Sequence, residues 1–447
     1  MAKHHGTKPW PLVVLTACPL HGHMTGTLQL ATTLHAKGFH IAFAHSTLNP
    51  PDPTNLPPDF IFLPLFDHLT AVDDSRSFTT FLKEINNECK ASFKEHLIRL
   101  IGEGNKSIVV IYDNNMFFAG IVALDLNLAA ISFRPNSAAY LPATLARLQL
   151  CQQSRFLEQD FVMNEMVPNY HPIRYKDLPF SGSPIEDWKE LVAIFNRHPR
   201  PSAIIVNTIK SLEHEALTLI HNHYNVPVFA IGPLHKIKPT GDATHLKGDT
   251  SCITWLDKQS PKSVIYISFG SLATLDANVL TEMVWGLAQS NRPFLWAVRP
   301  GSVCGWEWVE FLPEGFLEET KDRGLIVKWA PQKEVLSHFA VGGFWSHGGW
   351  NSILESVSEG VPMICQPFIA DHMVNTRYAS YVYKIGIELE VFERGEIERM
   401  IRKLMVDEGN EIRVRANNMK KMVEIALESG GCSHDSLDDL VRFICSC

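Results

Sequence analysis

The segment from Trp329 to His372 contains the side chains best suited to bind a nucleotide joined to a sugar. Its central turn, residues 347–349, follows the apolar run 341–345 and precedes helical spacing from Asn351, which predicts a strand, a glycine turn and a helix start. Glycines let a backbone approach a ligand closely, and the unpaired amides at a helix start favour anions. We therefore predict that this turn binds a diphosphate.

Other side chains in the segment suit the remaining parts of such a ligand. Asn351 and Ser352 stand where side chains cap a helix and could hydrogen-bond the same anion. Glu355 follows one helical turn later, where a carboxylate can accept both hydroxyls of a ribose, and Trp329 offers a flat face to a base. Each feature alone is more often a plain cap or core residue, so the interpretation depends on their order.

As a whole, the segment closely resembles the secondary-product box of the plant family-1 UDP-dependent glycosyltransferases. Shorter matches lie at 265–271, 255–257 and 19–23, and the chain most resembles the subgroup that includes steviol-glycoside and cytokinin glycosylating enzymes. The resemblance implies that a UDP-sugar is the donor substrate. It places the following residues at the donor site: Ser271, Trp329, Ala330, Gln332, His347, Gly349, Trp350, Asn351, Ser352, Glu355, Asp371 and His372.

Catalysis of sugar transfer requires a base, because an acceptor hydroxyl is a poor nucleophile until its proton is removed. An imidazole titrates near neutral pH, and the resemblance assigns this role to His23, in the loop after the first strand, rather than to His21. It assigns the holding of that ring to Asp113, which follows the apolar run 108–112. The implied reaction is a single displacement that converts an α-linked UDP-sugar into a β-glycoside.

The identity of the sugar depends on the end of the box, which has Asp371-His372 where the family usually has a carboxylate followed by Gln. A neutral imidazole offers one donor and one acceptor in a fixed ring, so the pattern of sugar hydroxyls that it can hydrogen-bond differs from that of an amide. Trp350 matches the residue usual in glucose users, so UDP-glucose is favoured. UDP-galactose and UDP-arabinose, or another pentose donor, are the alternatives.

The acceptor is expected to be a lipophilic small-molecule plant metabolite that carries a hydroxyl. The segments expected to line its pocket, 61–69, 116–118 and 136–150, are largely apolar. Flavonoid, terpenoid, hormone and alkaloid scaffolds all fit this description.

Other classes of protein are disfavoured by missing motifs. A dinucleotide oxidoreductase would need Gly-x-Gly-x-x-Gly after its first strand, and a P-loop nucleotidase would need Gly-Lys-Ser/Thr. A sugar-nucleotide binding protein without turnover would be expected to lack His23 or Asp113. No Asp-x-Asp triplet occurs, and His21 with His23 makes too few ligands, so we expect neither a metal nor another cofactor.

Composition indicates an ordinary globular protein of two domains. The chain has 447 residues, 45% of them hydrophobic, and a net charge of −8, which offers no basic surface for nucleic acid. The nine cysteines are scattered and odd in number, which favours free thiols and a cytoplasmic location. No apolar stretch is long enough to span a membrane, and we expect a monomer.

The elements that must position these residues alternate between strands and helices, which predicts an α/β protein with parallel sheets. Near the start we predict a strand at 12–17, a helix at 28–36 closed by Gly38, and a strand at 41–44. In the second half we predict strands at 263–268, 293–298, 324–327 and 341–345. The resemblance implies the GT-B fold, with two doubly wound Rossmann-like domains facing across a cleft. We expect an acceptor-binding domain at 1–233, a linker at 234–250, a UDP-sugar-binding domain at 251–433, and a final helix at 434–447 packed back on the first domain.

Overall fold

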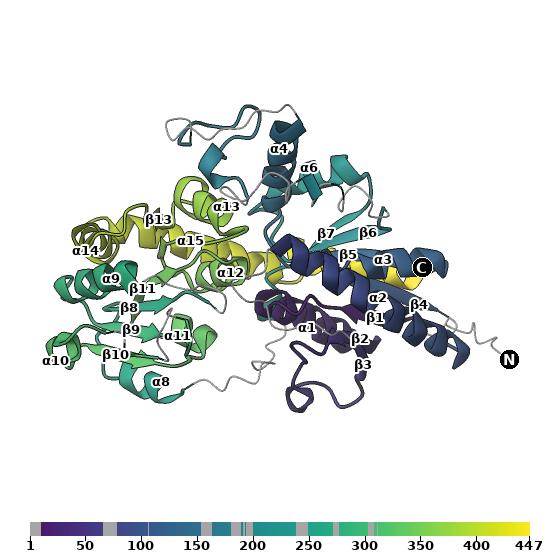
Figure 1. Ribbon diagram of the computed structural model, residues 1–447, viewed down its shortest axis with the longest axis horizontal. Coiled ribbons are helices and arrows are strands. Elements are labelled where there is room, and N and C mark those ends of the chain that lie inside the picture. The colour runs from purple at the N-terminus through teal and green to yellow at the C-terminus, as the bar shows by residue number, and fades with distance from the viewer. Residues whose placement is uncertain are drawn as a thin grey trace. The chain divides into compact units, whose positions relative to one another are not determined.

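A computed structural model describes residues 10–65, 78–105, 107–152, 163–179, 189–190, 193, 200–237, 249–270, 277–302, 308–310 and 312–447 (Figure 1). By its internal contacts the chain divides into two compact units. The first unit consists of Met1–Ala138, Pro184–His245 and Leu427–Cys447, and the second of Ala139–Ser183 and Leu246–Ala426. Each unit is built around one parallel sheet.

The described strands of the first unit form a seven-stranded parallel sheet in the order β3-β2-β1-β4-β5-β6-β7. Its strands are β1 (Leu12–Thr16), β2 (His40–Ser46), β3 (Ile61–Leu65), β4 (Ile108–Asp113), β5 (Ala129–Arg134), β6 (Ala203–Val206) and β7 (Val228–Ala230). All five residues of β1 and all six of β4 are buried. Continuous apolar runs of this kind are typical of central strands covered by helices on both faces.

Helices cover both faces of this sheet. On one face, α1 (His21–Ala36), α7 (Leu234–Ile237) and α16 (Cys432–Ser446) share a core with Leu15, Ile111 and Phe133. On the other face, α3 (Phe118–Asp125) meets Tyr112, since a Cβ on its Gly120 would lie 2.8 Å from that ring. Helices α2 (Phe78–Gly102) and α6 (His214–Tyr224) also belong to this unit. The C-terminal helix thus belongs to the first unit, where Leu437, Leu440 and Ile444 are buried.

The described strands of the second unit form a six-stranded parallel sheet in the order β10-β9-β8-β11-β12-β13. These strands are β8 (Val264–Ser268), β9 (Phe294–Ala297), β10 (Gly324–Val327), β11 (Val341–Ser346), β12 (Met363–Cys365) and β13 (Gly386–Glu388). The connecting helices are α8 (Ser251–Leu256), α9 (Ala277–Gln289), α10 (Phe316–Thr320), α11 (Gln332–Ser337), α12 (Trp350–Glu359), α13 (His372–Arg377), α14 (Arg394–Arg402) and α15 (Gly409–Leu427). Helices α9 and α14 share a core with one face of the sheet.

The predicted α/β class, with two doubly wound parallel sheets, is confirmed, but three local predictions need correction. Helix α1 begins at His21 rather than at residue 28, so His23 lies in its first turn and not in a loop. The first residues of the predicted linker, Leu234–Ile237, form helix α7, while residues 238–248 lie outside the described part of the chain.

The third correction concerns residues 139–183, which the sequence placed in the first domain and which group with the second unit by their contacts. These residues include α4 (Tyr140–Gln152) and the short 3-10 helix η3 (Tyr175–Asp177), both of which contact α13. The physical reason is an ion-pair cluster around Arg174, whose partners include Glu388 of β13.

Candidate active site

In the first unit, the two residues predicted to carry the chemistry form a direct pair. The Nδ1 atom of His23 lies 2.7 Å from Oδ2 of Asp113, whose side chain is fully buried, whereas 19% of the His23 side chain is exposed. The second carboxylate oxygen of Asp113 accepts a hydrogen bond of 2.9 Å from the backbone amide of Asn115. The carboxylate is therefore fixed from both sides while the imidazole keeps contact with solvent.

The fold brings this pair together at the carboxyl edge of the sheet. Asp113 is the last residue of β4, and His23 follows β1 at the start of α1. Strands β1 and β4 are neighbours in the sheet, and the chain connections run in opposite directions from this point. Ligands of open α/β sheets bind at such a switch point, beyond the carboxyl ends of the strands.

Helix α1 reaches its position because glycine stands at residue 26. A Cβ at Gly26 would lie 3.1 Å from Cβ of Pro135, closer than most real side-chain contacts. The absence of a side chain lets the first turns of α1, which carry His23, lie close to the loop after β5.

In the second unit, His347 follows β11, the strand next to β8 at the switch point of that sheet. Two glycines enclose its ring, because a Cβ at Gly270 would lie 2.8 Å from Nε2 and a Cβ at Gly349 would lie 2.4 Å from the same atom. Burial lowers the pKa of His347 to about 4, and a hydrogen bond with the backbone of Ser268 opposes this only in part. The ring is therefore neutral at pH 7.

Three further predicted donor residues are joined by hydrogen bonds. The side-chain amide of Gln332, at the start of α11, donates to Oγ of Ser352 at 3.0 Å and to Oε2 of Glu355 at 2.8 Å. Both acceptors lie on α12 and are buried. The helices that follow β10 and β11 are thereby linked at the predicted ribose-binding carboxylate.

The predicted cap of α12 is wrong. Its N-cap residue is Gly349, which has no side chain, and Asn351 and Ser352 lie inside the first turn of the helix. The Ser352 hydroxyl instead accepts the hydrogen bond from Gln332. The predicted anion site at this turn retains the backbone amides of the first turn, which the helix itself does not use.

The two predicted sugar-binding residues lie at the start of α13. Asn375, which was not predicted from the sequence, donates at 2.9 Å both to Oδ2 of Asp371 and to the carbonyl oxygen of Gly348. This buried amide therefore joins the start of α13 to the glycine turn. The i, i+4 spacing of Asp371 and Asn375 is a signal that could have revealed it.

His372 is the first residue of α13 and is buried. Its ring meets that of His347 edge to face, with 4.7 Å between the centroids. Burial, and then the neighbouring His347, hold the pKa of His372 well below its usual value. The backbone amide of Ile369 lies 3.4 Å from Nδ1, which acts as the acceptor, so the proton of the neutral ring is on Nε2.

The remaining predicted donor residues lie at the carboxyl edge of the same sheet or outside the described residues. Trp329 and Ala330 lie between β10 and α11, and the carbonyl oxygen of Trp329 accepts a hydrogen bond of 2.9 Å from the amide of Asp249. Trp350 and Asn351 open α12, where Trp350 is buried. Ser271 lies outside the described part of the chain.

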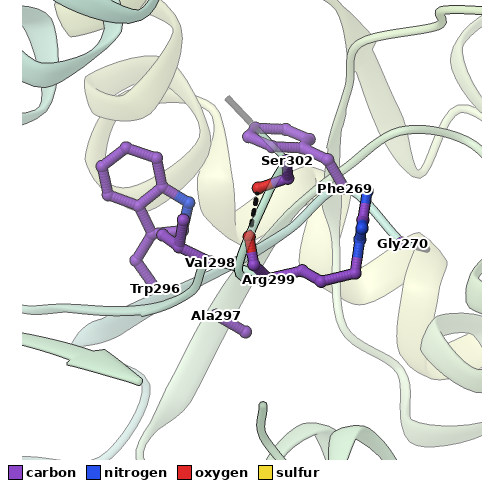
Figure 2. Close-up of a pocket in the computed structure, with 7 residues that line it drawn as sticks. All are labelled: Phe269, Gly270, Trp296, Ala297, Val298, Arg299 and Ser302. Atoms are coloured by element: carbon purple, nitrogen blue, oxygen red, sulfur yellow. Dashed lines mark hydrogen bonds between the residues drawn. The ribbon is translucent and has the colours of Figure 1, made fainter. Parts of the chain in front are cut away.

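A small hollow lies beside this group, between the ends of β8 and β9 (Figure 2). It is lined by Phe269, Gly270 and Trp296 and by Arg299, whose carbonyl oxygen accepts a hydrogen bond of 2.6 Å from the Ser302 hydroxyl. Burial lowers the pKa of Arg299. Arg299 was not predicted from the sequence, although a cation directly after the apolar run 293–298 was a visible signal.

Three expectations outside the site concern metals, membranes and cysteines. Within the described ranges, no group of three His, Cys, Asp or Glu side chains could hold a metal ion, and no helix is long and apolar enough to cross a membrane. The cysteines that the structure describes are free, as predicted: Cys18, Cys89, Cys252, Cys365, Cys432, Cys445 and Cys447.

Known proteins of one enzyme family are similar to this chain along most of its length. The sequence model of a family described as UDP-glucoronosyl and UDP-glucosyl transferase matches residues 69–410. UDP-glycosyltransferase 76H1 of Stevia rebaudiana is 52% identical over 94% of this chain and 100% of its own length. A flavonol 3-O-glucosyltransferase of Arabidopsis thaliana, UGT76E12, is 43% identical over 97% of this chain and 96% of its own length.

Solved structures are similar along almost the whole chain. UGT2 of Phytolacca americana, in complex with UDP-2-fluoro-glucose and pterostilbene, has a TM-score of 0.84 and 26% identity, covering 97% of this chain and 99% of its own. A UDP-glucosyltransferase of Polygonum tinctorium has a TM-score of 0.83 and 28% identity, and the match covers 99% of this chain and 100% of that enzyme's chain. These structures have the GT-B fold, so the predicted fold class is confirmed.

Proposed function

Because this chain belongs to the plant family-1 UDP-dependent glycosyltransferases, as its sequence predicted, we propose that it transfers glucose from UDP-glucose to a hydroxyl of a lipophilic small molecule with inversion at the anomeric carbon. The relatives also support the predicted subgroup that includes steviol-glycoside enzymes. The observation that carries the proposal is the hydrogen-bonded pair of His23 and Asp113 at the switch point of the first sheet.

In the proposed reaction His23 is the base. With Asp113 ionised, Nδ1 of the imidazole is the donor in the bond of 2.7 Å, so the lone pair that accepts a proton is on Nε2. The acceptor oxygen forms a bond to the anomeric carbon while its proton passes to Nε2. The bond from that carbon to the diphosphate breaks, and its electron pair leaves with UDP. Asp113 stabilises the imidazolium that forms.

The leaving diphosphate is proposed to bind at the glycine turn and the start of α12. A helix of ten residues presents its first amides and the positive end of its dipole to an anion. The pKa of about 4 makes His347 neutral, so in this proposal it contributes a hydrogen bond rather than a positive charge. Glu355 would accept the ribose hydroxyls, and Trp329 would stack on uracil, as the resemblance implies.

Glucose remains the favoured sugar, with UDP-galactose and UDP-arabinose as alternatives. The tautomer of His372 gives it an N–H donor at Nε2, whereas the usual Gln would offer a donor and an acceptor. Asp371, held by Asn375, would accept hydroxyl hydrogens of the sugar. This pair of residues is where the choice among donors is proposed to be made.

The names of the relatives favour an aromatic acceptor. One relative is named for flavonols, one structure contains pterostilbene, and another enzyme is described as glucosylating indoxyl. We propose an acceptor of this lipophilic class for this chain too. We further propose that the enzyme acts as a monomer in the cytoplasm, consistent with its free thiols, and that it needs no metal.

A donor panel tests the proposal. Wild type and the variant His23→Ala are incubated with UDP-glucose, UDP-galactose or UDP-arabinose and a set of flavonols, stilbenes and diterpenoid alcohols, and products are detected by mass. We expect a hexose increment from UDP-glucose with wild type and a loss of at least about a hundredfold with His23→Ala. Preserved turnover in the variant would show that His23 is not the base. A larger yield of pentoside from UDP-arabinose than of hexoside from UDP-glucose would show that UDP-glucose is not the preferred donor.

A further inference from the structure

Residues 163–179 are anchored in the second unit by a buried ion-pair cluster. Arg174 is 7% exposed and Asp177 is 2% exposed. The backbone amide and Nε of Arg174 both donate to Oδ2 of Asp177 at 2.8 Å, and Nη2 donates to Oδ1 at 2.7 Å. The same Nη2 lies 2.8 Å from both carboxylate oxygens of Glu388, the last residue of β13.

The charges in this cluster depend on each other. Burial alone would lower the pKa of Arg174, but the hydrogen bonds and charges of Asp177 and Glu388 outweigh it and raise the pKa. Buried ion pairs of this kind are weak evidence for stability, because desolvation offsets much of their attraction. Such ion pairs are better suited to hold the neighbouring side chains in one arrangement, and the neighbour that matters here is Arg377.

Arg377 connects the cluster to α13. It is the last residue of that helix, and its Nε donates to the carbonyl oxygen of Pro172 at 2.8 Å. Its guanidinium also lies 3.8 Å from Oδ2 of Asp177 and stacks on the Tyr381 ring, 4.0 Å from its centroid. Arg377 is 8% exposed, so these contacts are largely removed from water.

The opposite end of α13 carries the residues proposed to bind the sugar. Asp371 is the N-cap residue and His372 the first residue, while Asn375 ties this end to the glycine turn. At about 1.5 Å per residue, the six residues of α13 span only about 9 Å. A shift of Arg377 would therefore be transmitted to Asp371 and His372, because the helix backbone is stiff over so short a length.

We propose that Arg377 is a positioning residue for donor-sugar recognition, and that residues 163–179 fix it so that Asp371 and His372 meet the sugar in one geometry. The inference rests on the proposed function, since it needs Asp371 and His372 at the sugar. Helix α4 also contacts α13 within this unit (Figure 1). Residues 163–179, which are remote in sequence from the box at 329–372, thus position Asp371 and His372.

The test compares binding of UDP with binding of UDP-2-fluoro-glucose by titration calorimetry, which needs neither an acceptor nor turnover. Arg377→Lys keeps the charge near Asp177 but loses the planar guanidinium that bonds Pro172 and stacks on Tyr381. Arg377→Met also removes the charge. Arg394→Lys is the matched control, because Arg394 pairs with Glu282 on an exposed surface of the same unit.

We expect both Arg377 variants to bind UDP-2-fluoro-glucose about threefold to thirtyfold more weakly than wild type, with UDP affinity unchanged. The control should match wild type for both ligands. Equal weakening for UDP and UDP-2-fluoro-glucose would show a merely structural role, and unchanged affinity for both would also overturn the inference. If Arg377→Met does not fold, as judged by its melting, Arg377→Lys decides. Wild type that binds neither ligand would instead refute the proposed function.

Discussion

Replacing Asp113 by Asn is the change whose consequence follows most fully from the structure. Asn115 donates its backbone N–H to Oδ1 of Asp113, so the oxygen of an asparagine side chain must stay at that position. Its NH2 group then occupies the position of Oδ2, 2.7 Å from Nδ1 of His23. Because an amide NH2 only donates, Nδ1 becomes the acceptor and the ring proton moves to Nε2. The atom proposed to accept the acceptor's proton is then blocked.

The size of the loss can be bounded from general principles. General base catalysis contributes about 10² to 10⁴ in rate, and the same change in a Ser-His-Asp triad costs about 10⁴ in kcat. These factors correspond to about 3 to 5 kcal/mol of transition-state stabilisation. We therefore expect kcat of Asp113→Asn to fall by at least about a hundredfold, with UDP affinity unchanged because the donor residues lie in the other unit.

The assay measures initial rates with UDP-glucose and the best acceptor of the panel, together with UDP binding and thermal melting. The matched control is Asp59→Asn, because Asp59 also binds a histidine, with 2.9 Å between its Oδ2 and Nε2 of His35, but lies exposed in the same unit. The control should keep wild-type kcat. A value of kcat for Asp113→Asn within about threefold of wild type, in folded protein, would refute the tautomer argument.

Three further results are expected. Gly349→Ala should lower UDP affinity and cost about 1 to 3 kcal/mol of stability, because its Cβ would lie 2.4 Å from Nε2 of His347. The control Gly395→Ala, with open space around its Cβ, should lower neither UDP affinity nor stability. Equal effects of the two variants on UDP binding in calorimetry and on unfolding in denaturant would contradict this. Burial lowers the pKa of His347 to about 4 in the folded state from its ordinary value of 6.5, so the unfolded chain binds more protons between those pH values. Stability in urea should therefore fall by up to about 2 kcal/mol from pH 7 to pH 5, and a His347→Asn variant should fall less; an equal slope would count against the buried neutral ring. His372→Gln should raise use of UDP-glucose relative to UDP-galactose, since an amide adds an acceptor; an unaltered ratio in competition assays would refute the role of this residue.

Features encoded in local sequence were predicted well. The predicted strand 324–327 has the same bounds as β10, and the predicted strand 341–345 differs from β11 by one residue. Both runs are short and apolar and are bounded by turn residues, which is the pattern of a buried strand. The glycine turn after β11 was also predicted, and the positive φ of Gly348, +80°, requires a residue of that type.

Features that depend on distant contacts could not be read from the sequence. The start of α1 at His21 has no side-chain cap, because its N-cap residue is Leu20, so no local signal marks it. The contact of Arg174 with Glu388 joins residues 214 positions apart, which periodicity does not reveal. The pair of His23 and Asp113, 90 positions apart, was predicted only through the family resemblance.

The central claim is that His23 activates a hydroxyl for one direct displacement at the anomeric carbon of a UDP-sugar. The most direct measurement is the anomeric configuration of the product, obtained by proton NMR from α-linked UDP-glucose with wild type and with His23→Ala. Our account predicts a β-glycoside from wild type, and product formation at least about a hundredfold slower with the variant. An α-glycoside, or a β-glycoside formed equally fast without the imidazole, would contradict it.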